Sequence, residues 1–159
     1  MLSGTGELGV DDGEPEHATF AQPSGIDVFA QQLVIADAAG SAIRVIRLLD
    51  NRVSTMIGAG LYEFGDVNGK RDQARLQNPL GLCADPRGLV FIADSYNGKI
   101  KALNMRNGEI RTLNLQHRFH EPTDLSLAAG ALWIANTNAH EIVRVDLATG
   151  KTQHVPVGE

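Results

Sequence analysis

The sequence contains few of the residues that would point to several common classes of protein. Only one of its 159 residues is cysteine, so no disulfide, Cys-x-x-Cys redox pair or thiolate zinc site can form within the chain. No apolar run approaches the ~20 residues of a membrane-spanning helix, and the first residues lack the pattern of a signal peptide. We therefore expect no membrane contact and place the chain in the reducing cytoplasm.

Positive charge is also scarce and is not clustered. The chain has 14 Lys and Arg against 19 Asp and Glu, for a net charge of -5, and its cations are scattered singly. A phosphate backbone needs a basic stripe, so nucleic acid is not an expected partner. Hydrophobic residues make up 43% of the chain, which is enough for one globular domain and too much for a disordered one.

What the sequence does contain is one pattern repeated three times. Three similar segments have a proline at the fourth position: residues 20–26, 76–82 and 119–125. Each is followed by a short apolar segment that ends in Asp or Asn: residues 33–37, 89–94 and 132–136. Each repeat is one supersecondary unit that cannot bury its apolar face alone. The fold must therefore stack these units against one another.

Each unit is predicted to contain four strands. Its apolar runs are short, rich in Val, Ile and Leu, and separated by turn residues. In the middle unit the expected strands are residues 81–85, 89–93, 99–104 and 109–113, with turns at 86–88, Asn97-Gly98 and Asn107-Gly108. These are the signals of successive hairpins.

The repeat length indicates a β-propeller. Pro23 and Pro79 are 56 positions apart and Pro79 and Pro122 are 43 apart, against the ~40–50 residues of a propeller blade. We predict an all-β fold of three four-stranded antiparallel blades, about half of a six-bladed propeller. The expected blades are 20–57, 76–114 and 119–156, with long connections at 4–19 and 58–75. Closed propellers have 4 to 8 blades, so we expect further blades, or pairing of two copies, to complete the ring.

The ends of the strands add a family resemblance. Ile35-Ala-Asp37, the stretch from Ile92-Ala-Asp94 to Ile100 and the stretch from Ile134-Ala-Asn136 to Ile142 resemble the NHL-repeat β-propellers, most closely those that follow a thioredoxin-like domain. The resemblance implies a non-catalytic scaffold that binds a protein or small ligand, without a cofactor, within a longer polypeptide. Three alternatives stay open: a propeller enzyme, either a metal-dependent lyase or a lactone hydrolase; the propeller half of a thioredoxin-like redox protein; and a purely structural spacer that positions a neighbouring domain.

The predicted topology gathers candidate binding residues at one end of the blades. In an up-and-down blade, the hairpin between strands two and three lies at the same end as the connection between blades, and such loops commonly carry function. The candidates are Asp37, Asp94, Ser95, Tyr96, Asn97, Lys99, Asn136 and Asn138 from the hairpins, and Tyr62, Phe64, Arg71 and Arg75 from the second connection. Alternatively, the Asp and Asn side chains shape turns and the aromatic residues pin the connection to its blade.

Candidates for catalysis and metal binding are few. No catalytic residue is assigned, because no Ser-His-Asp or Cys-His set emerges from the spacing. His117, His120 and Asp27 are the candidate metal ligands, although the histidines fall at variable positions typical of solvent-facing side chains. Cys83 falls in a first strand and is expected to be a small buried thiol.

Overall fold

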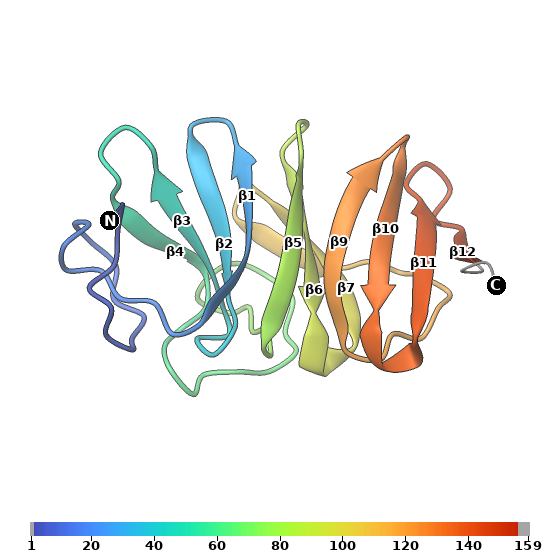
Figure 1. The fold of residues 1–159 in the computed structure, drawn as a ribbon, viewed down its shortest axis with the longest axis horizontal. Coiled ribbons are helices and arrows are strands. Elements are labelled where there is room, and N and C mark those ends of the chain that lie inside the picture. The colour runs from blue at the N-terminus through green and yellow to red at the C-terminus, as the bar shows by residue number, and fades with distance from the viewer. Residues whose placement is uncertain (1, 156–159) are drawn as a thin grey trace.

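Three separate four-stranded sheets make up the chain in the computed structural model, which describes residues 2–155 (Figure 1). The first contains β1 Pro23–Phe29, β2 Gln32–Asp37, β3 Ala42–Arg47 and β4 Val53–Ile57. The second contains β5 Pro79–Asp85, β6 Leu89–Asp94, β7 Lys99–Asn104 and β8 Glu109–Thr112, and the third β9 Pro122–Ala128, β10 Ala131–Asn136, β11 Glu141–Asp146 and β12 Thr152–Val155. Every sheet is antiparallel, with its strands in chain order. The predicted fold class, three blades of a β-propeller, is confirmed.

Strand positions agree closely with the sequence pattern, whereas one turn differs. The expected strands of the middle blade lie within two residues of β5 to β8. The turn at Asn97-Gly98 is longer than a two-residue hairpin, because a short 3-10 helix, η1 Ser95–Asn97, precedes it; η2 Thr137–Ala139 is its counterpart in the third blade. Residue 156, the expected end of the third blade, lies outside the described residues.

The first strand of each blade lies innermost, next to the first strand of its neighbour. Strand β5 contacts both β1 and β9 (Figure 1). A glycine makes each approach possible: a Cβ atom on Gly25 would lie 2.7 Å from the carbonyl oxygen of Leu80, and one on Gly81 would lie 2.5 Å from that of Thr123. The glycine two positions after the proline in the first two units is therefore required by the packing of inner strands.

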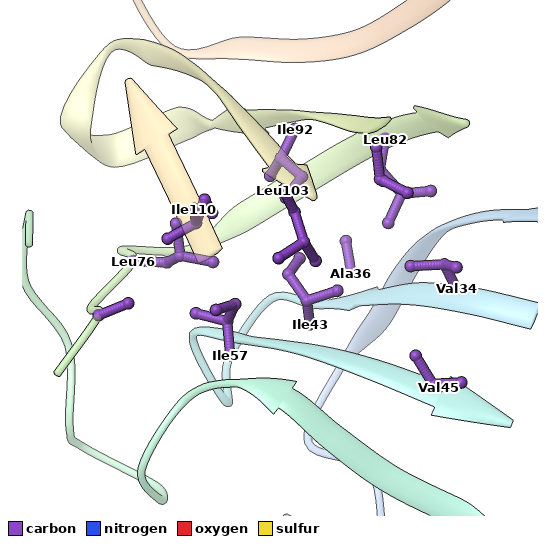
Figure 2. Close-up of a cluster of buried hydrophobic side chains, with 12 residues drawn as sticks. Val34, Ala36, Ile43, Val45, Ile57, Leu76, Leu82, Ile92, Leu103 and Ile110 are labelled. Carbon is purple, nitrogen blue, oxygen red and sulfur yellow. The ribbon is translucent and has the colours of Figure 1, made fainter. Parts of the chain in front are cut away.

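Apolar side chains on alternate positions fill the space between blades. Val90 and Ile92 of β6 point to the first blade, whereas Phe91 and Ala93 point to the third. Figure 2 shows the cluster between the first two blades, in which Ile43 and other residues of the first blade meet residues of the second. A strand with two apolar faces is a strand buried on both sides, so the middle blade is the centre of the core.

The outer faces of the first and third blades are only partly covered. Ile26 and Val28 of β1 are 60% and 54% exposed, and Trp133 of β10 is half-buried beneath the guanidinium of Arg144. The expected closure of the ring by further blades or by a second copy stays a prediction. Nowhere in residues 2–155 is there a helix with the length and apolar character needed to cross a bilayer.

Candidate functional site

One end of the blades carries all the connections between strands two and three, and both long connections pass through it before they run along a fourth strand, where Gly13 bridges to Val53 and Gly69 to Ile110 (Figure 1). We call this end the connection end and define it by residues 38–41, 58–66, 95–98 and 137–140. The opposite end carries the hairpins between strands one and two and between strands three and four. The predicted binding residues lie at or next to the connection end, but the structure gives them different roles.

Asp37, Asp94 and Asn136 are fully buried and serve the fold. Each lies at the end of the second strand of its blade and accepts a hydrogen bond from a backbone N–H in the segment that enters the first strand. The distances are 2.6 Å from Gln22 to Asp37, 2.8 Å from Gln77 to Asp94 and 2.7 Å from His120 to Asn136. The turn-shaping interpretation predicted bonds to the following residues, whereas these bonds hold the preceding segment.

A buried cation accompanies the carboxylate in the first two blades. Arg44 of β3 lies 3.2 Å from Asp37, and Lys101 of β7 lies 3.4 Å from Asp94; both cations are fully buried. In the third blade the position equivalent to the cation is Val143, and the position equivalent to the carboxylate is the neutral Asn136. The third blade has therefore lost the acid and the base together, as expected because an unpaired buried charge is strongly destabilising.

The same cations also hold the long connections. Arg44 contacts Asp12 of the first connection at 3.1 Å, and Lys101 contacts Asp66 of the second at 2.8 Å. The backbone N–H and hydroxyl of Thr55 also donate to Asp12, at 3.0 and 2.7 Å. No long connection precedes the third blade, which has no buried cation at this position. Each buried cation thus couples a connection to its blade.

This charged network was not predicted from the sequence. A signal for it is present in the sequence. In the first two repeats, an acidic residue ends the second strand and a cation occupies the third position of the third strand. The third repeat has neither. The second carboxylate could not be assigned from spacing, since Asp12 precedes Arg44 by 32 residues and no periodic pattern links a loop to a strand over that distance.

The carboxylates of the structure predict a loss of stability in acid. Several have a pKa held below the usual range by hydrogen bonds and nearby cations, against the effect of burial: Asp12, Asp66, Asp85, Asp146 and Glu141, with Asp50 lowered to about 2 chiefly by its hydrogen bond from Arg47. Depressed pKa values stabilise the fold above the unfolded pKa and lose that contribution as the pH falls through the folded one. Asp94 opposes this trend, because burial raises its pKa despite bonds from Asn97 and Gln77.

We therefore expect the free energy of unfolding to decrease as the pH falls from about 4, the unfolded pKa of a carboxylate, to about 2, the folded pKa of Asp50, because the other carboxylates are also shifted downward. Urea titrations followed by circular dichroism at successive pH values will measure the decrease. Equal urea midpoints at both ends of this interval would contradict the assignment.

Three exposed aromatic side chains distinguish the connection end. Tyr62, Phe64 and Tyr96 are 84%, 58% and 61% exposed. The alternative that the aromatic residues pin the connection to its blade does not fit Tyr62, which is almost fully exposed. The side-chain amide of Asn97 donates to the carbonyl oxygen of Gly65 at 2.7 Å. Phe64 directly precedes Gly65 in the sequence, and Tyr96 directly precedes Asn97. We call Tyr62, Phe64 and Tyr96 the aromatic surface.

The other predicted binding residues are engaged within the chain or lie at the surface. The Ser95 hydroxyl donates to the carbonyl oxygen of Pro122, and Lys99 pairs with Asp66. Arg71 pairs with Asp12 at 3.2 Å, and Arg75 lies 4.0 Å from Glu63. Asn138 is exposed.

The three candidate metal ligands do not come together. His117 contacts Glu141 at 2.8 Å, the side chain of His120 is exposed, and the carboxylate of Asp27 accepts a hydrogen bond from the Ala84 N–H at 2.8 Å. Across residues 2–155 no three His, Cys, Asp or Glu side chains are placed to hold a metal ion. His117, His120 and Asp27 therefore do not form a common metal site in this structure.

Cys83 of β5 has the surroundings of an unreactive thiol. It is only 6% exposed, and burial, with the charges of Asp27, Asp124 and Asp85, raises its pKa to about 12. Because the thiolate is the reactive form, such a thiol is inert at neutral pH. The expected small buried thiol fits this position.

Comparison with known proteins places these blades in a family. Residues 51–159 match the family described as "Repeat of unknown function (DUF6923)". NHL repeat-containing protein 2 of Homo sapiens is 33% identical in an alignment of 168 positions, gaps included, that covers 90% of this chain and 23% of that protein. Protein SUPPRESSOR OF QUENCHING 1, chloroplastic, of Arabidopsis thaliana is 29% identical over 98% of this chain and 17% of its own length. The chain thus spans about a quarter or less of these relatives.

The fold also matches a solved structure. Virginiamycin B lyase from Staphylococcus aureus superposes with a TM-score of 0.62 and 18% sequence identity, over 87% of this chain and 42% of the lyase. At this identity the likeness concerns the fold alone. Taken together, the repeated blades and the sequence matches show that this chain belongs to the NHL-repeat β-propellers and to the repeat family DUF6923.

Proposed function

We propose that the chain is a non-catalytic recognition module that binds a protein partner through the aromatic surface. The observation that carries this proposal is the exposure of Tyr62, Phe64 and Tyr96 at one end of the blades. Large aromatic side chains are enriched at protein interfaces and provide much of their binding energy. Burying these apolar surfaces against another protein would therefore contribute favourable binding free energy.

The anchoring of the second connection supports this proposal. The Lys101–Asp66 pair and the Asn97–Gly65 hydrogen bond hold the connection on its blade at two successive residues. A loop that is fixed before binding loses less conformational entropy on association. Tyr62 has a φ of 70°, in the left-handed region that residues other than glycine rarely adopt. Such backbone conformations are concentrated at ligand-contacting positions.

The enzyme alternatives receive less support. A metal-dependent propeller enzyme needs acidic or histidine side chains on the inner strands, and the carboxylate of Asp27 already bonds the backbone N–H groups of Ala84 and Val28. A redox role in a thioredoxin-like protein would have to involve groups other than Cys83, whose thiol is buried. The recognition role requires neither.

The test compares two sets of surface variants. The triple variant Tyr62→Ser/Phe64→Ser/Tyr96→Ser removes the aromatic surface, and Leu48→Ser/Leu49→Ser is the control, because these leucines are 40% and 85% exposed at the opposite end. Proteins captured by the wild type and the control are identified by mass spectrometry, purified and measured by biolayer interferometry. We expect the triple variant to bind at least about tenfold more weakly, as for loss of interface hot spots. Equal affinity of all three proteins would reject the proposal.

A further inference from the structure

A second surface feature lies at the end opposite the aromatic surface, between the second and third blades. Two hollows of about 430 and 410 Å³ meet there, and Arg87 and Leu147 line both of them. The larger hollow also contains Arg106 and Arg111 above apolar side chains that include Phe91 and Leu113. We call the two hollows together the arginine groove.

Two of the three guanidinium groups are available to a ligand. Arg87 is bound by the carboxylate of Asp85, with its Nη2 at 2.6 Å from Oδ2. The side chains of Arg106 and Arg111 are exposed and, within the described part of the chain, make neither an ion pair nor a hydrogen bond. Their positive charge is locally concentrated on a chain whose net charge is -5.

The other blades show that the fold does not require these cations. Arg111 pairs with Ala102 in the register of β7 and β8, and the equivalent positions are Ser54 in the first blade and Gln153 in the third. Arg106 follows Asn104 by two residues, and the equivalent residues are Leu49 and Ala148. The turns that correspond to Arg87 contain no cation. A feature present in one repeat of three, and absent at equivalent positions, points to a role beyond the architecture of the blade.

We propose that the arginine groove binds an extended acidic peptide segment. Guanidinium groups form paired hydrogen bonds with carboxylates, so Arg106 and Arg111 suit two acidic side chains of a ligand. Leu113 and Leu147 offer an apolar floor for a side chain between them. The continuity of two hollows fits an extended segment better than a compact anion. Three cations over an apolar floor are too few for a nucleic acid backbone.

The test uses the full chain and defined peptides. Fluorescence anisotropy is measured with a labelled peptide that alternates glutamate and leucine, and with a glutamine–leucine peptide of equal length. We expect saturable binding of the acidic peptide alone, weakened by salt because exposed ion pairs are screened. Arg106→Gln/Arg111→Gln should bind about tenfold more weakly. The matched control, Lys70→Gln/Arg118→Gln, removes the same charge from two exposed positions outside the groove and should bind as the wild type does.

Three results would overturn the proposal. The first is the absence of saturable binding to the acidic peptide. The second is an equal loss of affinity in both double variants, because that would reflect net charge and not the groove. The third is complete competition by inorganic pyrophosphate at concentrations similar to the peptide, which would assign the groove to small anions. None of these results depends on the aromatic surface, so the two proposals can fail separately.

Discussion

Replacing Lys101 by valine is expected to destabilise the protein by about 3–5 kcal/mol, the cost of breaking a buried ion pair by removing one partner. Lys101 and Asp94 both have fully buried side chains, and the side chain of Asp66 is 33% exposed. Without the ammonium group, Asp94 would keep a negative charge in a site that already raises its pKa by burial. Urea unfolding followed by circular dichroism measures the difference.

The third blade provides the compensating change. There Val143 stands where Lys101 does and Asn136 where Asp94 does, and Asn136 still accepts its hydrogen bond from the backbone at 2.7 Å. The double variant Asp94→Asn/Lys101→Val should therefore be more stable than Lys101→Val by about 2 kcal/mol or more, since it removes the unpaired charge and retains the bond from Gln77. If the changes in unfolding free energy of Asp94→Asn and Lys101→Val simply add in the double variant, Asp94 and Lys101 are not energetically coupled and the proposal is wrong.

The overall fold could be predicted from the sequence because the same pattern occurs three times in the chain. A single unit of short apolar runs is ambiguous, but three units with a shared proline and a shared terminal Asp or Asn allow each strand to be checked against two others. The strands of the middle blade were accordingly predicted within two residues. The alternating pattern of β6, with Val90 and Ile92 on one face and Phe91 and Ala93 on the other, also follows from the period of a strand.

The candidate site was accessible only in part, because repetition does not reveal what a side chain contacts. Asp37 and Asp94 stood out as polar residues at strand ends, and a buried structural carboxylate and an exposed ligand have the same sequence signal. The pairing of Asp12 with Arg44 depends on how a loop returns over the blade, and Tyr62, which is 84% exposed, has a left-handed backbone although it is not glycine. Neither has a local pattern. The arginine groove is formed by hairpins of two different blades, so no local pattern in the sequence indicates it.

The second prediction with a large expected effect concerns Gly81, near the start of the inner strand β5. Gly81→Ala is expected to destabilise the protein by about 3 kcal/mol or more, at the upper end of the cost of overpacking. Its Cβ atom would lie 2.5 Å from the carbonyl oxygen of Thr123 and 2.6 Å from the Cα of Asp124. Both contacts are backbone atoms of β9, which cannot move aside as a flexible side chain could. The second and third blades would have to separate along their inner edges.

A second glycine distinguishes this steric effect from the general cost of the substitution. Gly130 has a φ of 72°, and a methyl group added to it would meet no atom within 4 Å, so Gly130→Ala should cost only the ~1 kcal/mol of a left-handed alanine. Hydrogen exchange measured by mass spectrometry then locates the effect. In Gly81→Ala the amides of β9 and β10 should exchange faster while those of β2 and β3 stay protected, since each blade contacts only its neighbours. Uniform loss of protection, or equal stability of the two variants, would show that close packing of the inner strands does not hold adjacent blades together.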